Sequence, residues 1–274
     1  MIEIGGIPLH LYGLMIGLGV LVGGSISAWV AKREGVETDL VWDGLVWVMF
    51  FGVVGARAYH VIDYWSYYSV HLVQVVEVWR GGLGVYGGII GGLVGIVIVE
   101  LSNCRIAKNK KQVTLLTLLD IASFGVPVGQ AIGRWGNYFN QELFGAPTSL
   151  PWGIYISPEN RPVGMEQFSH FQPLFLYESL LSWGLFIVLV ISYKKSIRQA
   201  RNEQQPRWEV GRGKYLGMYL FGYGLIRMVL EPLRLRSWSV GVIPMAQLMS
   251  GVIIAMGIYL MVRKKRLTKV SNRQ

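Results

Sequence analysis

The residues best suited to chemistry in this 274-residue chain lie in one short stretch. Residues 133–142 read GRWGNYFNQE, which places one arginine, three amides and one carboxylate at the end of an apolar segment, and Gly145 follows closely. A helix cap would explain Asn137 or Asn140 alone, but not the whole group. Ionisable residues at membrane depth are candidates for function because their burial is costly. This stretch, with Arg134 as its cation, is therefore the first candidate site.

A second group of polar residues lies in an apolar segment near the C-terminus. Tyr223, Arg227, Glu231 and Arg234 are separated by offsets that keep them within an arc of about 80° on a helix. Such a face could hold an anionic ligand, or Arg227 and Glu231 could form a purely structural pair. Pro232 has no amide hydrogen and predicts a kink that would take Arg234 off this face.

Histidine and cysteine offer fewer candidates. None of the histidines has metal-ligand spacing with another, so we expect no metal site. The single cysteine, Cys104, excludes a disulfide framework, and we expect it to be inert. Neither a Gly-x-Ser-x-Gly motif nor a phosphate-binding loop occurs in the sequence. The histidines are His10, His60, His71 and His170.

The elements that must position these residues are membrane helices. The chain is 52% hydrophobic and only 15% charged, too little charge to cover the surface of a soluble protein of this size. A helix needs about 20 mostly apolar residues to cross the hydrocarbon core of a bilayer. The sequence predicts an all-α, polytopic membrane protein with one integral membrane domain over residues 1–274. The seven predicted spans are Leu9–Val30, Val41–Ile62, Leu83–Leu101, Val113–Trp135, Pro173–Tyr193, Tyr215–Leu233 and Ile243–Val262.

The basic residues predict the orientation of these spans. With seven spans, the loops after the first, third and fifth share a side with the C-terminal tail, and they hold 19 of the 26 basic residues, including every lysine. By the positive-inside rule this side is cytoplasmic and the N-terminus lies outside. The net charge of +10 is therefore mainly a topology signal, and we expect no nucleic-acid partner.

The remaining basic residues are all arginines, within spans or on the outer side. Arginine presents a planar fork that suits phosphate or carboxylate, so these residues could bind an anionic ligand. Internal pairing with acidic residues is the alternative. The arginines are Arg57, Arg80, Arg134, Arg161, Arg227, Arg234 and Arg236, and the possible partners are Asp63, Glu77, Asp120, Glu142, Glu178 and Glu231.

Three further segments have a predicted place. Residues 136–172 contain four prolines and are expected to form an irregular cap over the outer face. Residues 60–79 mix aromatic and polar side chains, as an interfacial segment does. In the third span, glycines recur every four residues at positions 84, 88 and 92 and again at 87, 91 and 95, which favours close helix packing.

With these motifs the chain resembles the phosphatidylglycerol–prolipoprotein diacylglyceryl transferase family of bacterial plasma membranes over nearly its whole length. The most specific motif is Gly133-Arg134-x-Gly136-Asn137-x-x-Asn140-x-Glu142-x-x-Gly145. Others are His10-Leu-Tyr12-Gly13, Gly55-Ala-Arg57, Gly81-Gly82-Leu-Gly-Val-Tyr86-Gly87-Gly88, Pro173-x-x-x-Tyr177-Glu178 and Tyr223-Gly224-x-x-Arg227-x-x-x-Glu231-x-x-Arg234.

The resemblance implies transfer of an sn-1,2-diacylglyceryl group from phosphatidylglycerol to the thiol of a lipobox cysteine in a prolipoprotein signal peptide, with release of glycerol 1-phosphate. It implies that Arg134 binds the lipid head group and that Arg227 assists transfer. The partners are then these two substrates and the lipid bilayer, without a cofactor. The implied catalytic residues are Arg227, Tyr223, Glu231 and Tyr86. The implied substrate-binding residues are Arg134, Asn137, Asn140, Glu142, Gly145, Arg234, Tyr12 and His10.

Two positions depart from the family pattern. Tyr86 stands where many members have histidine, and a tyrosine hydroxyl ordinarily has a pKa near about 10, which makes it a poor base at neutral pH. Gln172 precedes Pro173 where a histidine is common. The resemblance therefore leaves the proton acceptor for the thiol open.

Two other classes of function compete with a transferase. An anion or lipid transporter would also place arginines toward a cavity, but it predicts paired broken helices in two halves and a polar path to the cytoplasm, and neither is evident in the sequence. A structural membrane scaffold would not need the group of arginine, asparagine and glutamate in residues 133–142.

Overall fold

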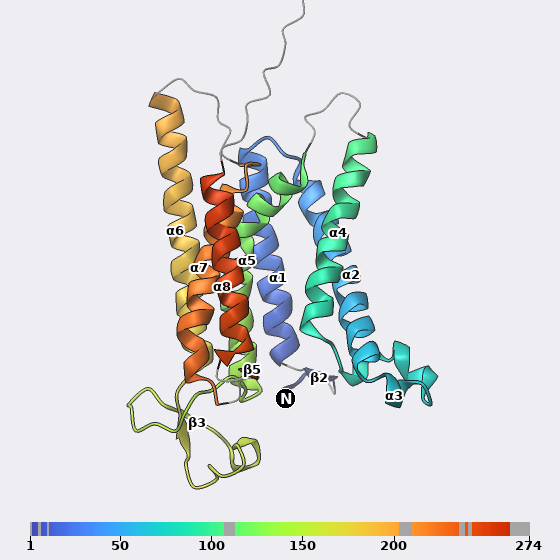
Figure 1. Cartoon of the computed structure of the whole chain (residues 1–274), viewed down its shortest axis with the longest axis vertical. Coiled ribbons are helices and arrows are strands. Elements are labelled where there is room, and N and C mark those ends of the chain that lie inside the picture. Colours follow the sequence, from blue (N-terminus) through green and yellow to red (C-terminus); the bar gives the residue numbers. More distant parts are fainter. Residues whose placement is uncertain are drawn as a thin grey trace, which may run out of the picture. The chain divides into compact units, whose positions relative to one another are not determined.

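The computed structural model describes residues 2–4, 7–9, 11–106, 113–202, 210–235, 239–240 and 243–263 (Figure 1). Long helices make up most of the described chain. They are α1 (Leu11–Arg33), α2 (Thr38–Asp63), α4 (Val85–Ile106), α5 (Leu115–Phe139), α6 (Leu174–Asn202), α7 (Lys214–Leu230) and α8 (Met245–Val262).

Strands are short in the described residues and form three antiparallel ribbons of two strands each. They pair β1 (Ile2–Ile4) with β2 (Ile7–Leu9), β3 (Ile154–Tyr155) with β4 (His170–Phe171), and β5 (Ser239–Val240) with β6 (Ile243–Pro244).

The helices have the length and composition of membrane spans. Six of them, α1, α2, α4, α5, α6 and α8, are long and apolar enough to cross a bilayer. Helix α7 has 17 residues, at the lower end of the range for a span. Large apolar side chains such as Phe50, Ile191 and Val252 are more than half exposed on these helices, as they are on helices that face lipid. The prediction of an all-α polytopic membrane protein is confirmed.

The predicted spans overlap the observed helices, and the differences have local causes. Leu9 and Ile243 were expected to begin spans, but they pair in β2 and β6, where Leu9 lies opposite Ile2. Helix α6 continues past Tyr193 to Asn202, because lysine, arginine, glutamine and alanine all favour a helix. Helix α7 ends at Leu230 and continues as a 3-10 turn, η4 (Glu231–Leu233), so the break predicted from Pro232 is confirmed.

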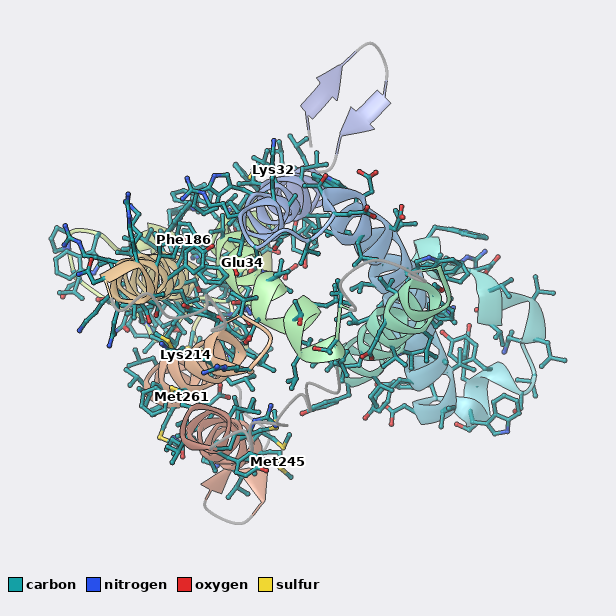
Figure 2. The ribbon with its side chains drawn as sticks, turned by 90° about the horizontal axis from the view of Figure 1, so that it is seen from above. Lys32, Glu34, Phe186, Lys214, Met245 and Met261 are labelled. Atoms are coloured by element: carbon teal, nitrogen blue, oxygen red, sulfur yellow. The ribbon has the colours of Figure 1, made fainter. Side chains whose placement is uncertain are left out.

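The chain divides into two compact units, which we describe separately. Unit 1 comprises Met1–Ile26 and Ala122–Gln274, and unit 2 comprises Ser27–Ile121. In unit 1, α7 lies between α6 and α8, as Figure 2 shows in a view along the helices. Glycines allow the close contact of α7 with α8: a Cβ on Gly217 would lie 2.8 Å from the carbonyl oxygen of Gly257, and the reverse distance is 2.7 Å.

A second glycine contact in unit 1 joins α1 to α5. A Cβ on Gly19 would lie 2.8 Å from the carbonyl oxygen of Gly129, and one on Gly23 would lie 2.7 Å from that of Gly125. Larger side chains would force these helices apart. The contact fixes α5, which carries the GRWGNYFNQE motif at its far end.

Unit 2 is centred on the pair of α2 and α4. The glycines predicted to favour packing lie at this contact, where a Cβ on Gly95 would lie 2.7 Å from the carbonyl oxygen of Trp47. Cβ atoms on Gly87 and Gly91 would also collide with the backbone of α2. The expected close helix packing is confirmed. At the other end of α4, the Glu100 carboxylate accepts a hydrogen bond from the first amide of α5, Leu115, at 2.7 Å.

The segment between α2 and α4 contains short helices. They are α3 (Trp65–Tyr68), η1 (Leu72–Val76) and η2 (Val78–Arg80). Arg57 of α2 holds the segment: its guanidinium group donates to the carbonyl oxygens of Gln74 and Val75 and to those of Gly81 and Gly82. The Arg57 side chain is buried and also lies over the ring of Tyr68, 5.2 Å from the ring centroid.

The cap of unit 1 follows α5. It contains the ribbon of β3 with β4 and the 3-10 turn η3 (Pro158–Asn160), and the rest is irregular, as expected. Arg161 stabilises its turns by donating to the carbonyl oxygens of Ile156 at 2.9 Å and Glu166 at 2.8 Å. Glu166 accepts from the Gly164 amide, and backbone hydrogen bonds lower the pKa of this exposed carboxyl group.

Candidate active site

The last turn of α5 starts the site in unit 1. The Arg134 guanidinium group donates from Nη2 to Oε1 of Glu178 at 2.6 Å and from Nη1 to Oδ1 of Asn137 at 3.4 Å. The side chain of Arg134 is 22% exposed, whereas that of Glu178 is 4% exposed. The arginine therefore contacts a buried carboxylate while its own side chain stays partly exposed.

Glu178 is the centre of the site. Its Oε2 atom lies 3.9 Å from Nη1 of Arg227 and 3.8 Å from Nη2 of Arg234, so one carboxylate faces three guanidinium groups. From the sequence, Glu178 is predicted only as a possible partner of an arginine and as part of a motif, not as a site residue. Its signal was a carboxylate inside an otherwise apolar segment that begins at Pro173.

The end of α7 supplies the other two arginines. Nη2 of Arg227 donates to Oε2 of Glu231 at 2.7 Å, one helical turn apart. Because Pro232 ends the regular helix, Arg234 has an extended backbone, yet its Nε still lies 3.7 Å from Oε2 of Glu231. Burial, and next the charge of Arg227, lower the pKa of Arg234 from its ordinary value, whereas the carboxylates of Glu231 and Glu178 act in the opposite direction.

A backbone contact holds Arg234 in place. Gly145 forms an antiparallel bridge with Arg234 and donates its amide to the carbonyl oxygen of Gln172 at 2.8 Å. A Cβ on Gly145 would lie 2.9 Å from the carbonyl oxygen of Leu233 and 3.2 Å from Leu174. Only glycine fits at this crossing of three segments without a shift of the backbone.

A strained turn presents Glu142 next to α5. Gln141 and Leu143 both have positive φ angles, 53° and 54°, which cost non-glycine residues energy. The Glu142 amide donates to the carbonyl oxygen of Asn137 at 2.8 Å, and its carboxylate accepts from the side-chain amides of Asn137 at 3.5 Å and Asn140 at 3.0 Å. The two asparagines thus join Glu142 to the Arg134 end of the site.

The cap supports this turn through one side chain. Oε1 of Gln141 accepts from the amide of Ser157 at 2.8 Å and from Nδ2 of Asn160 at 3.1 Å. These two bonds offset part of the cost of the positive φ angle at Gln141.

The remaining candidates differ in their position. Tyr223 lies one turn before Arg227 on α7. Tyr12, in the first turn of α1, packs on α5, because a Cβ on Gly136 would lie 3.0 Å from its ring. Tyr86 belongs to unit 2, where it lies in the first turn of α4 with its ring 6.0 Å from that of Tyr59. His10 lies outside the described residues.

The charges of this cluster do not balance. Arg134, Arg227 and Arg234 carry three positive charges, and Glu178 and Glu231, both buried, carry two negative charges when ionised. One positive charge is therefore left over among these five side chains, since the third carboxylate, Glu142, is exposed to solvent and accepts from the two asparagines. Such a site favours a ligand with one negative charge, and the planar guanidinium groups suit the oxygens of a phosphodiester.

For the arginines within spans or on the outer side, two interpretations were open: binding of an anionic ligand or internal pairing. The structure distinguishes them for each residue that it describes. Arg57 and Arg161 bind backbone carbonyl oxygens, and the exposed Arg80 pairs with Glu77 at 3.0 Å. Arg134, Arg227 and Arg234 pair internally and also leave an excess of positive charge. Arg236 lies outside the described residues.

Comparisons with known proteins show the family of the chain. The family model described as prolipoprotein diacylglyceryl transferase matches residues 1–263. A phosphatidylglycerol–prolipoprotein diacylglyceryl transferase of Synechocystis sp. is 34% identical over 278 residues, covering 100% of this chain and 93% of the relative. The protein with this name from Nostoc sp. is 38% identical, covering 98% and 92%, and that from Finegoldia magna is 37% identical, covering 95% and 93%. This chain, with its arginine cluster around a buried glutamate, belongs to the prolipoprotein diacylglyceryl transferase family.

Proposed function

We propose that the chain transfers the sn-1,2-diacylglyceryl group of phosphatidylglycerol to the thiol of a lipobox cysteine in a prolipoprotein signal peptide and releases glycerol 1-phosphate. The observation that carries this proposal is the set of three guanidinium groups around Glu178, with one positive charge more than the two buried carboxylates compensate. The phosphodiester of phosphatidylglycerol carries one negative charge and fits this excess.

During the reaction, negative charge develops on the phosphate group. The cysteine sulfur forms a bond to the sn-3 carbon of the lipid, and the bond from that carbon to the phosphate oxygen breaks. The bonding electrons stay on the phosphate oxygen, while the thiol proton goes to a base. Negative charge therefore grows on the leaving glycerol phosphate, and cations held in place before the reaction stabilise that charge in the transition state.

We assign two roles to the site residues: some bind the lipid, and others assist the transfer step. Arg134, whose side chain is 22% exposed against 15% for Arg227, binds the phosphate, and Arg227 stabilises the leaving group. Glu178 and Glu231 position these guanidinium groups. Tyr223, Arg234, Asn137, Asn140, Glu142, Gly145, Tyr12 and His10 complete the proposed catalytic and substrate-binding set.

The base for the thiol proton is a separate part of the proposal. Tyr86 is our candidate, because it follows Gly81-Gly82 in the family motif and its side chain is 48% exposed at the start of α4. Tyr86→Phe removes the hydroxyl group alone. We expect it to lower the transfer rate and to flatten the dependence of that rate on pH.

The proposal includes an orientation in the bacterial plasma membrane. The N-terminus lies outside and the C-terminus lies in the cytoplasm, so the arginine cluster faces the outer side, where the lipobox cysteine would meet it. The excess of lysine and arginine in alternate loops supports this orientation. A reporter that works only outside the cytoplasm, fused after Gln274, should stay inactive, and activity would contradict the orientation.

The reaction itself can be tested with purified protein in liposomes. We expect a lipobox peptide to gain the mass of one diacylglyceryl group for each glycerol 1-phosphate released from phosphatidylglycerol. A peptide with serine in place of the lipobox cysteine should release none. Release of glycerol phosphate without modification of the cysteine peptide would contradict transfer and indicate a lipid hydrolase.

A further inference from the structure

One polar pair inside unit 1 has no role in the cluster described above. Nε2 of Gln130, on α5, donates to the hydroxyl oxygen of Tyr219, on α7, at 2.9 Å. Both side chains project from apolar membrane helices, where a polar group needs a partner. The pair therefore joins the two helices that carry Arg134 and Arg227.

The pair has hydrogen-bonding capacity left over. Oε1 of Gln130 is buried and, among the described residues, has no hydrogen-bond partner. The Tyr219 oxygen accepts from Gln130, which leaves its own proton available to donate, and no acceptor for that proton is found in the described part of the chain. Buried polar groups are normally satisfied, so the Tyr219 proton needs an acceptor that the described residues do not supply.

The pair lies just below the arginine cluster. Gln130 is one helical turn before Arg134, and Tyr219 is two turns before Arg227, so the pair is about 6 to 12 Å from the cluster along the helix axes. Helices α5 and α7 both end at the cap (Figure 1), so the pair lies on the side of the cluster away from the cap, toward the middle of the spans. The ring of Tyr223 stacks on that of Tyr219, with 5.8 Å between the two ring centroids.

We propose that Tyr219, held in place by Gln130, binds an ester carbonyl group of the diacylglycerol whose phosphate lies in the arginine cluster. The inference rests on the proposed function and adds a second contact with the same lipid. In phosphatidylglycerol the two ester groups lie a few bonds from the phosphate, on the side of the acyl chains. The Tyr219 hydroxyl lies one to two helical turns from the phosphate-binding arginines, toward the middle of the spans. This is the direction in which the ester groups follow the phosphate.

The chemistry of the pair favours an ester carbonyl over other groups of the lipid. The head-group hydroxyls lie on the opposite side of the phosphate, and the acyl chains have no acceptor. The carbonyl oxygen accepts the Tyr219 proton, while the Gln130 amide keeps the tyrosine oxygen turned so that this proton points away from α5. Lipids with ether-linked chains lack the carbonyl oxygen and would lose this hydrogen bond.

Ether analogues give a direct test, because the ester groups do not react during transfer. The experiment compares kcat/KM for transfer to a lipobox peptide from diester and diether phosphatidylglycerol with the same chain length. One uncharged hydrogen bond corresponds to a preference of about three- to tenfold. We expect the wild-type protein to prefer the diester by this factor and Tyr219→Phe to use both lipids equally. Gln130→Leu should reduce the preference in the same direction.

Tyr259→Phe is the matched control, since Tyr259 is an exposed tyrosine on α8, and it should keep the wild-type preference. If Tyr219→Phe keeps that preference too, or if the wild-type protein uses both lipids equally, the inference is wrong. Equal losses on both lipids in Tyr219→Phe would also overturn it and indicate a structural pair bridged by water. Failure of the proposed function would appear differently, as no transfer from either lipid by the wild-type protein.

Discussion

Two arginine sites, one in each unit, use the same side chain in opposite ways. In unit 2, Arg57 directs its donors to four backbone carbonyl oxygens of the segment that follows α2. In unit 1, Arg134 and Arg227 face carboxylates on other turns and helices, and Arg134 keeps one edge partly exposed. An arginine surrounded by the main chain holds a fold together. In the proposed function, the unit 1 arginines, which outnumber the buried carboxylates, bind an anion.

We expect the largest effect on transfer when the arginines of unit 1 are replaced with lysine. Arg134→Lys and Arg227→Lys keep the charge but lose the planar fork, so the transfer rate should fall by about 10² to 10³. Arg134→Lys should act mainly through use of the lipid, and Arg227→Lys mainly through turnover. The measurement is initial rate against phosphatidylglycerol concentration, on folded and inserted protein.

Arg198→Lys provides a control for this pair, because Arg198 is exposed near the end of α6. It should keep the wild-type rate. Near-normal rates for both Arg134→Lys and Arg227→Lys at every lipid concentration would show that these arginines are structural.

The second-largest effect on the transfer rate is expected from replacing the two buried glutamates. Glu178→Gln removes the charge that three guanidinium groups share, so we expect the rate to fall by about 10- to 100-fold. Glu231→Gln affects two of the arginines, and its loss should be about three- to tenfold. Rates for both variants would be measured at saturating lipid. A larger loss in Glu231→Gln than in Glu178→Gln would mean that orientation of Arg227 matters most.

Arg57→Lys should affect stability rather than catalysis. A lysine cannot reach the four carbonyl oxygens together, so the free energy of unfolding should fall by about 2 to 4 kcal/mol. Thermal unfolding in detergent would measure the loss, and KM for phosphatidylglycerol should stay at the wild-type value. A raised KM with an unchanged unfolding temperature would place Arg57 with the lipid-binding arginines instead.

The smallest effect is expected at the only cysteine. The attacking thiol comes from the prolipoprotein, so Cys104→Ser should leave transfer unchanged in the assay with a lipobox peptide. Complete loss of activity in a stably inserted Cys104→Ser protein would mean that the chain supplies a thiol of its own.

Contacts within one helix were predictable from the sequence. Residues one turn apart share a helix face, so spacing predicts a possible pair of Arg227 and Glu231. The break follows from Pro232, which has no amide hydrogen. Runs of apolar residues likewise located the spans, because the length of a span is set by the thickness of the bilayer.

Contacts between helices were not predictable in this way. The bond from Arg134 to Glu178 joins residues 44 positions apart, and no local period relates them. The bridge of Gly145 with Arg234 depends in turn on how the cap folds back over the end of α7. The central role of Glu178 therefore emerges only once the packing of α5, α6 and α7 is known.

The length of helix α6 indicates how deep in the bilayer the proposed site lies. Its apolar part, from Leu174 to the first lysine at position 194, rises about 30 Å, which matches the hydrocarbon thickness of a bilayer. Glu178 lies about 6 Å from the start of this part. If Leu174 marks the boundary of the hydrocarbon core, the arginines that surround Glu178 lie about one helical turn inside it, close to the head-group layer. A phospholipid could then enter sideways from the leaflet and react without being lifted out of the membrane.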